Sequence, residues 1–385
     1  MTPSRYHRIE NSAALAAAVD HALGMTAVAM DLEADSMFHF QERVCLIQMA
    51  TSKHIFIIDP LSIDDLAPLG TLLASAAVEK IFHGADYDVR SLYRDYEFEL
   101  DRLFDTELAS RFLGVKQTGL NNILEDRFSV KLDKRFQKKD WSQRPLPEAM
   151  VAYAANDVAY LLPLAQTLRD ELTAAERLAW VAEELEHLRR VRPAEENGDP
   201  LFMRFKGAGR LQPRQLSILE ALLQVRRQIA RHKDRPPFKV MSNRAITRLV
   251  EATPTDARQV RQSGALSPKQ LQMYADQLSG AVKNALALPA GRLPRYPRQP
   301  RGLRKPSHPE RIKRFKVWRE HKARALDLEP GLILNNALLT AIADQNPRSL
   351  AALARVDGIR NCQVQSFGPE ILTLIPDKEK TRARS

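Results

Sequence analysis

Two carboxylates separated by one residue, Asp31 and Glu33, end an apolar stretch that is typical of a buried strand. Alternate side chains of a strand point to the same face, so both carboxylates would point the same way. Two acids on one face of a core strand repel each other unless a cation lies between them. Oxygen ligands suit Mg²⁺ or Mn²⁺, so the pair indicates a divalent-metal site.

A second acidic segment, residues 80–92, reads KIFHGADYDVRSL. Its pattern predicts a short strand that ends at His83 and a helix that begins near Gly84. Asp86 could be a first-turn acid that the positive end of the helix dipole favours. Asp88 lies further into the helix and is the other candidate for a metal ligand.

A third acidic position lies within residues 148–162, whose pattern predicts a helix. Tyr153 and Asp157 are four residues apart and therefore share a helix face. An aspartate among apolar neighbours is costly without a partner. Either Tyr153 and Asp157 form a hydrogen bond inside the core, or they belong to a site.

Together, the three segments predict one centre in which four carboxylates hold two divalent cations. Such a centre clamps the attacking and the leaving oxygen of a phosphodiester displacement. The Tyr153 hydroxyl would then orient the attacking water, which is a positioning role more than that of a strong base. The residues alone therefore predict metal-dependent phosphodiester hydrolysis.

An α/β domain must position these groups. Apolar, partly β-branched runs predict strands at residues 26–33, 44–51, 54–59 and 79–83. Amphipathic patterns predict helices at residues 11–23 and 64–74. The segment from Gly84 to Thr173 is predicted to consist of helices and loops, so strands come early in this domain and helices late.

Charge is divided unevenly along the 385 residues. The chain carries a net charge of +11, with −8 in residues 1–180 and +19 in residues 181–385. Clustered Lys and Arg can hold a polyanion, so the distribution favours nucleic-acid binding over a merely solvated basic surface. The chain has only two cysteines and no apolar run that could span a bilayer, which predicts a reduced cytoplasmic protein without a membrane partner.

The basic half is predicted to be helical, with an unusual segment in its middle. Residues 289–309 carry six prolines and are expected to form an extended, polyproline-like linker. Arginines recur there at the three-residue period of a polyproline helix, at Arg292, Arg295, Arg298, Arg301 and Arg304. They would line one edge, either as a cationic rail for a phosphate backbone or as part of a soluble tether.

The N-terminal motifs resemble the DEDD exonuclease superfamily and, within it, the tyrosine branch of the ribonuclease D type. Asp31 and Glu33 match the first motif, D-x-E, and Tyr153 and Asp157 match the third, Y-x-x-x-D. The second motif has its acid five residues after a histidine, which selects Asp88 over Asp86. The connecting runs are similar too: LDK at 132–134, DW at 140–141, RPL at 144–146 and YAANDVAYLLPL at 153–164.

This resemblance covers most of residues 1–175. It implies a ribonuclease H-like fold with a mixed sheet, two Mg²⁺ or Mn²⁺ ions and release of 5′-mononucleotides. The basic half resembles the same family, because residues 211–287 and 307–375 are similar to HRDC domains, helical modules that some helicases share with ribonuclease D. The HRDC-like copies would bind or position nucleic acid, or would serve only as packing scaffolds.

The expected fold class is therefore an α/β ribonuclease H-like exonuclease domain followed by two small all-α HRDC-like domains. In chain order we expect an exonuclease domain (1–175), a helical linker (176–208), a first HRDC-like domain (209–288), a Pro/Arg-rich linker (289–306), a second HRDC-like domain (307–376) and a charged tail (377–385).

Further residues are candidates for RNA contact, each with a structural alternative. His83 could touch substrate or close its strand. Trp141 could stack on a base or pack against a helix. Arg144 could hold a phosphate or pair with an acid. Lys138 and Lys139 could guide RNA into the site or simply be solvated.

The predicted function is a monomeric 3′→5′ exoribonuclease that trims structured RNA, and the resemblance implies tRNA precursors as substrates. A DNA 3′→5′ exonuclease in repair is the first alternative, because no residue visibly reads a 2′-hydroxyl. The second is a non-catalytic RNA-binding scaffold, against which the complete set of four acids and one tyrosine argues. The third is a helicase accessory protein that acts through the HRDC-like modules.

Overall fold

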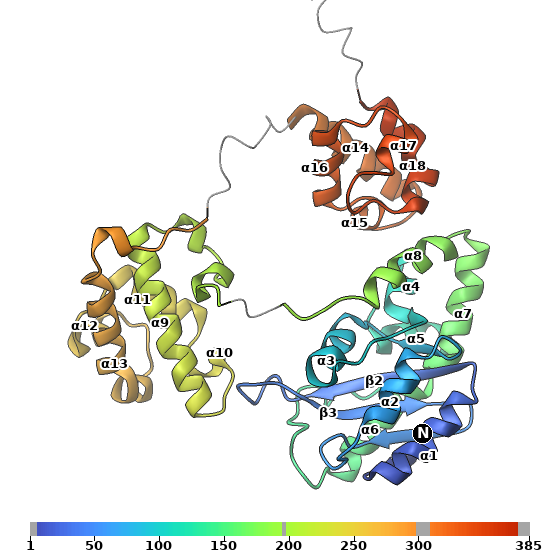
Figure 1. The fold of residues 1–385 in the computed structure, drawn as a ribbon, viewed down its shortest axis with the longest axis horizontal. Coiled ribbons are helices and arrows are strands. Elements are labelled where there is room, and N and C mark those ends of the chain that lie inside the picture. The colour runs from blue at the N-terminus through green and yellow to red at the C-terminus, as the bar shows by residue number, and fades with distance from the viewer. Residues whose placement is uncertain (1–5, 195–197, 298–308, 376–385) are drawn as a thin grey trace, which may run out of the picture. The chain divides into compact units, whose positions relative to one another are not determined.

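The computed structural model describes residues 6–194, 198–297 and 309–375, which form two compact units (Figure 1). The described residues of the first unit lie within 1–33, 44–193 and 304–385, and those of the second within 34–43 and 194–303. The units therefore do not follow the order of the sequence. No helix in the described ranges is both long and apolar enough to cross a membrane.

A six-stranded mixed sheet lies at the centre of the first unit, in the order β1-β4-β3-β2-β5-β6. β1 pairs parallel with β4, as β2 does with β5 and β5 with β6, whereas β3 pairs antiparallel with β4. The strands are β1 (Tyr6–Ile9), β2 (Ala27–Ala34), β3 (Val44–Ala50), β4 (Ile55–Ile58), β5 (Glu79–Phe82) and β6 (Leu103–Asp105). The mixed sheet confirms the predicted α/β class.

The two edge strands, β1 and β6, were not predicted from the sequence. β6 also contradicts the expectation of only helices and loops after Gly84. Each edge strand is at most four residues long, and β1 exposes two of its four side chains. A run this short shows no clear alternation, and pairing with a longer neighbour is what holds it in the sheet.

Helices cover both faces of this sheet. α1 and the ring of His21 lie on the face that carries Phe56, whereas α6 packs on β3 and β4 on the opposite face, over Leu46 and Ile57. The helices of this domain are α1 (Ser12–Leu23), α2 (Ala67–Ala74), α3 (Asp86–Tyr96), α4 (Thr106–Phe112), α5 (Leu120–Phe128), α6 (Glu148–Ala159), α7 (Leu161–Ala174) and α8 (Leu178–Leu188).

The C-terminal helices belong to the same unit. They are α14 (Pro309–Ala325), α15 (Pro330–Ile333), α16 (Asn336–Gln345), α17 (Leu350–Leu353) and α18 (Asn361–Thr373). Their core meets α8, where the Trp180 and Phe367 rings lie 5.4 Å apart. Beside them, Arg360 donates two hydrogen bonds to Glu184, at 2.9 and 3.2 Å. Apolar packing and ion pairing therefore join the last helical module to the exonuclease domain.

The second unit is helical. Its elements are η1 (Leu201–Arg204), η2 (Ala208–Arg210), α9 (Pro213–His232), α10 (Pro237–Val240), α11 (Asn243–Ala252), α12 (Ala257–Gln262), α13 (Pro268–Leu286) and η3 (Ala290–Arg292). The two long helices, α9 and α13, pack against each other (Figure 1). Each begins with a proline in its first turn behind a capping box, which is a strong helix-start signal.

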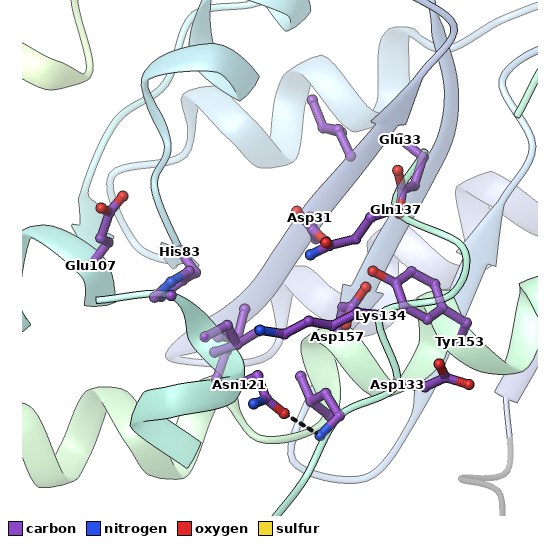
Figure 2. A pocket seen from close by; sticks show the side chains of 15 residues that line it. Asp31, Glu33, His83, Glu107, Asn121, Asp133, Lys134, Gln137, Tyr153 and Asp157 are labelled. Atoms are coloured by element: carbon purple, nitrogen blue, oxygen red, sulfur yellow. Dashed lines mark hydrogen bonds between the residues drawn. The ribbon is translucent and has the colours of Figure 1, made fainter. Parts of the chain in front are cut away.

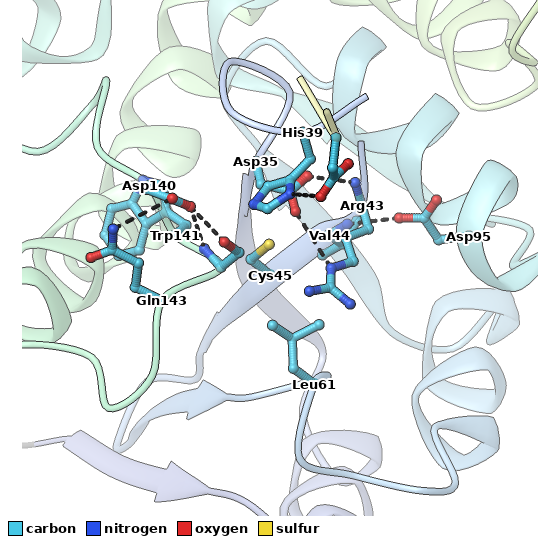
Figure 3. Close-up of polar contacts among 12 residues, drawn as sticks. Asp35, His39, Arg43, Val44, Cys45, Leu61, Asp95, Asp140, Trp141 and Gln143 are labelled. Carbon is cyan, nitrogen blue, oxygen red and sulfur yellow. Dashed lines mark hydrogen bonds and ion pairs between the residues drawn. The ribbon is translucent and has the colours of Figure 1, made fainter. Parts of the chain in front are cut away.

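The loop between β2 and β3, residues 34–43, is part of this second unit. Phe40 packs on the helical core, and its amide donates a 3.1 Å hydrogen bond to Asp234. His39 Nδ1 lies 2.6 Å from the other oxygen of the same carboxylate. At its base the loop is closed by the Arg43 amide, which donates to Asp35 at 2.8 Å (Figure 3). The loop between two strands of the sheet is thus held by helices far along the chain.

The Pro/Arg-rich segment differs from its prediction. Residues 290–292 form a 3-10 helix, so the polyproline expectation is wrong at Arg292. The Tyr296 ring then packs 6.2 Å from that of Phe202, because an aromatic side chain gains more from burial than from extension into water. Arg298, Arg301, Arg304 and the tail at 377–385 lie outside the described residues.

Candidate active site

Strand β2 and helix α6 bring acidic residues from distant parts of the chain to one cavity. Asp31, Glu33, Tyr153 and Asp157 all line a cavity of about 430 Å³. Figure 2 shows the two β2 carboxylates facing Tyr153 and Asp157 of α6. Leu32, between Asp31 and Glu33, is buried. The alternation of the strand and the i, i+4 spacing of the helix therefore give the shared faces that the sequence predicts.

Asp88 approaches the same acids from the first turn of α3. It is only 6% exposed, and the charges of Asp88 and Asp31 each act on the other members of the cluster. Asp86 differs, because it is exposed and accepts a 2.8 Å hydrogen bond from Arg90. Asp88, unlike Asp86, is therefore buried and near enough to Asp31 and Glu33 for their charges to act on one another, although it does not line the cavity.

An unpredicted residue, Asp105, fixes the start of α3. Its carboxylate accepts hydrogen bonds from the amides of Gly84 and Ala85, at 2.9 and 2.8 Å. Gly84 has φ +79°, and a Cβ there would lie 2.8 Å from the Glu107 carboxylate, so glycine suits this position. Asp105 is the last residue of β6, a strand too short to be recognised in the sequence, which is why the sequence analysis did not predict its role.

The four acids destabilise one another's charged forms. Burial raises the pKa of Asp31 to about 7. Burial also raises the pKa of Glu33, and Asp31, Asp157 and Asp88 raise it further. The pKa values of Asp88 and Asp157 are raised by burial and then by Asp31. Within the described part of the chain, no Lys, Arg or His forms an ion pair with any of the four. The cluster thus lacks a protein cation that would stabilise its ionised form, and its acids retain protons to higher pH instead.

Tyr153 stays protonated in this setting. Burial, Asp157 and Glu33 all raise the pKa of its hydroxyl, so it cannot act as a base near neutral pH. Its ring is fixed between Phe136, at 5.7 Å, and Trp141, at 6.1 Å. A rigid phenol beside carboxylates can donate or accept a hydrogen bond and so orient a water molecule.

Two of the residues proposed for RNA contact, Trp141 and Arg144, have structural roles instead. Trp141 is only 1% exposed and packs beside Tyr153, so no base can stack on it, and the packing alternative holds. Arg144 pairs with Asp59 through hydrogen bonds of 2.6 and 2.7 Å and also donates to the Cys45 carbonyl. These contacts occupy the guanidinium donors that a phosphate would need. Arg144 therefore pairs with an acid, which is the structural alternative.

His83 lines the cavity, next to the acids. Its Nδ1 lies 2.9 Å from the Thr106 hydroxyl, which itself donates to the Phe82 carbonyl. The ring also makes a hydrogen bond to the Thr118 backbone, so contacts with Thr106 and Thr118 together hold its orientation. Burial lowers the His83 pKa and favours the neutral form of the ring. His83 thus follows the end of β5 and borders the cavity, and its contact with substrate stays a prediction.

Lys138 and Lys139 are exposed and do not line the cavity. Lys134, Gln137 and Asn121 line it instead, and sequence reasoning did not propose them. A signal for Lys134 was present, since it ends the LDK run that the family resemblance includes. Lys134 makes no ion pair with the four acids, so its charge is available to a phosphate.

The donor set fits hard divalent cations. Two buried and two half-buried carboxylates without a compensating cation offer the oxygen ligands that ions such as Mg²⁺ prefer. Among the described residues, however, no group of three or more His, Cys, Asp or Glu side chains is arranged to hold an ion as it stands. Metal binding would therefore require the acidic side chains to move closer together.

Comparisons with known proteins show the family of the chain. The family model described as 3′-5′ exonuclease matches residues 6–173, and the HRDC domain model matches residues 215–282 and 308–375. A ribonuclease D of Granulibacter bethesdensis is 30% identical over 80% of this chain and 79% of its own length. A ribonuclease D of Gluconacetobacter diazotrophicus is 31% identical over 82% and 80%. The crystal structure of Escherichia coli RNase D has a TM-score of 0.73 at 23% identity, covering 96% of this chain and 98% of that one, which is a likeness of fold.

Proposed function

The chain belongs to the ribonuclease D family of 3′→5′ exoribonucleases, and we propose that it trims the 3′ ends of structured RNAs, such as tRNA precursors, by two-metal-ion hydrolysis. The observation that supports this mechanism most directly is the uncompensated acid cluster of Asp31, Glu33, Asp88 and Asp157. A purely structural set of buried acids would be paired with cations, because an unpaired buried charge is costly.

In this mechanism the four carboxylates would hold two Mg²⁺ or Mn²⁺ ions. When bound, the ions supply an activated water and stabilise the leaving 3′ oxygen. Tyr153 positions the attacking water through its hydroxyl and does not remove a proton. Lys134 faces the cavity and offers a positive charge to the phosphate of the terminal nucleotide. The product would be a 5′-mononucleotide and an RNA shortened by one residue.

RNA is the proposed substrate because the relatives are ribonucleases and because the basic half carries two HRDC modules. The modules would hold the body of the RNA through its phosphates while the 3′ end enters the acidic cavity. A metal-free cavity would repel the phosphate, so cleavage should stop completely in EDTA. The DNA exonuclease remains the alternative that the site chemistry allows.

The test is a 5′-labelled RNA with a single-stranded 3′ end, incubated with the protein and Mg²⁺. We expect a ladder of products that shorten one nucleotide at a time. A DNA of the same sequence is the matched substrate control, and equal or faster DNA degradation would contradict the ribonuclease assignment. The Asp157→Asn variant should bind RNA like the wild type and cleave none, so residual cleavage at the wild-type rate would contradict the proposed site.

Tyr153→Phe tests the positioning role. Loss of the hydroxyl should lower the cleavage rate by about 10²–10⁴-fold, the usual scale for a lost positioning or proton-transfer group. The fold and metal binding should be unchanged, because the ring keeps its contacts with Phe136 and Trp141. A single-turnover rate measured together with Mn²⁺ affinity separates the two effects. An unchanged rate would remove Tyr153 from the mechanism.

A further inference from the structure

One polar side chain in the middle of the sheet has no visible structural purpose. Gln48 lies on β3 and is 0% exposed. Neither its amide nitrogen nor its amide oxygen has a hydrogen-bond partner. A buried amide of this kind costs about 1–3 kcal/mol per unsatisfied group, and an apolar residue of the same size would avoid that cost.

Gln48 points to the face of the sheet that carries the acid cluster. In the antiparallel ladder it lies opposite Ile57, and paired residues of a ladder share a face. Ile57 packs with Leu46 and Tyr153 beneath α6, so Gln48 also faces α6. Asp31 lies on the neighbouring strand β2 and faces the same helix, because it lines one cavity with Tyr153 and Asp157 (Figure 2).

Few groups inside the protein donate to the acids. The hydrogen bonds that act on Asp31 and Asp157 come from the Leu32 backbone and from the Tyr153 side chain. The side-chain amides that line the cavity, those of Gln137 and Asn121, are exposed and half-buried, whereas Gln48 is fully buried. Ligands of a metal site are normally held by hydrogen bonds from a surrounding layer of groups. Gln48 on the neighbouring strand β3 has an unpaired amide that could supply such a hydrogen bond to the acid cluster.

We propose that Gln48 is a positioning residue, whose amide N–H restrains the carboxylates of the acid cluster while they hold divalent metal. This inference rests on the proposed metal-dependent function. It explains why a polar residue occupies a fully buried position whose hydrogen-bonding groups are unpaired in the metal-free protein. It also makes an unusual prediction, that removing the amide weakens metal binding without weakening the fold.

The test replaces the amide by an apolar group in the full-length chain. Gln48→Leu should leave the thermal unfolding temperature of the metal-free protein unchanged or raise it. The same variant should bind Mn²⁺ about 10–100-fold more weakly, the scale of a lost outer-layer contact, as measured by titration calorimetry. Met49→Leu is the matched control, because Met49 lies on the same strand opposite Phe56, on the other face, and its Mn²⁺ affinity should equal that of the wild type.

Each outcome decides one claim. If wild-type protein binds Mn²⁺ but Gln48→Leu binds it equally well, the positioning role is overturned and the proposed function stands. If wild-type protein neither binds Mn²⁺ nor shortens RNA, the proposed function fails and this inference fails with it. Should Gln48→Leu fold poorly, Gln48→Met provides the same loss of the amide on an unbranched side chain.

Discussion

Asp59 and Asp157 are almost equally buried, at 7% and 8% exposure, yet their pKa values move in opposite directions. Burial alone would raise the pKa of Asp59, but the hydrogen bonds and charge of Arg144 lower it below its ordinary value. Asp157 has no cation beside it, and burial together with Asp31 raises its pKa. The difference between these two regions lies in their partners and not in their depth.

The comparison separates acids that support the fold from acids that serve a ligand. Arg144 binds Asp59 through two hydrogen bonds and reaches the Trp141 carbonyl as well, so the pair joins two parts of the domain. The acid cluster forms no ion pair of this kind, and its members destabilise one another's charged forms. A neutral substitution should therefore harm stability in the first region and function in the second.

The largest expected effect is on catalysis. Asp31→Asn removes a proposed metal ligand and should lower the cleavage rate by at least about 10³-fold, or about 4 kcal/mol in the activation free energy. The metal-free variant should be at least as stable as the wild type, because one repelling charge has been removed from the cluster. Single-turnover cleavage and urea unfolding measure the two quantities. A variant that cleaves at the wild-type rate, or that unfolds at lower urea concentration, would contradict the view that Asp31 serves a ligand and not the fold.

The pH dependence of stability should show the same difference. The pKa of Asp31 is raised from 3.8 to about 7, so the folded state keeps a proton that the unfolded state loses. Its contribution to stability is therefore largest at low pH and declines as pH rises from about 4 to 7, by up to about 4 kcal/mol.

Urea unfolding of metal-free wild type and Asp31→Asn at pH 5 and pH 8 measures this decline. Between pH 5 and pH 8 the unfolding free energy of the wild type should fall more than that of the variant. Adding Mn²⁺ at pH 8 should restore the stability that the wild type has lost. Parallel losses in both proteins would show that Asp31 does not titrate in this range.

Breaking the ion pair in the other region should have the reverse signature. Asp59→Asn leaves the half-buried Arg144 guanidinium without its counter-charge, which should destabilise the protein by about 3 kcal/mol. The cleavage rate per folded molecule should be unchanged, because neither side chain lines the active cavity. Loss of cleavage at full stability would instead assign the pair to the catalytic machinery.

The smallest effect is expected where an ion pair is exposed. Lys116 and Asp327 lie 2.9 Å apart, with side chains 62% and 81% exposed. Lys116→Ala should change the unfolding free energy by less than about 0.5 kcal/mol, because solvent screens such pairs. A larger loss, measured by urea unfolding, would show that this contact between the exonuclease domain and the last helical module contributes more than its exposure indicates.

The sequence identified the acid cluster because its spacings are local. D-x-E on a strand and Y-x-x-x-D on a helix each fix a shared face without knowledge of the rest of the fold. Asp88 could be separated from Asp86 only by the family motif, since both lie in the first turn of α3. The sequence also predicted a helical basic half, and the long helices α9 and α13 confirm it.

Long-range contacts could not be read from the sequence. β1 and β6 are strands because of their partners, and nothing within YHRI or LFD distinguishes them from loops. The partner of Arg144 is 85 residues away, so pairing and phosphate binding looked equivalent. The same reason explains Trp141, whose burial depends on β3 and α6 together.

The capture of residues 34–43 by the helical unit has a practical consequence for anyone who divides this protein. A fragment cut before residue 194 would keep the loop but lose Asp234 and the apolar surface under Phe40. This segment starts directly after Glu33. In such a fragment the Phe40 ring would be exposed to solvent close to the end of β2, the strand that carries Asp31 and Glu33. Grafting the helical unit from a relative would likewise require transplanting the loop with it. The shortest exchangeable piece of this enzyme is therefore discontinuous in its gene.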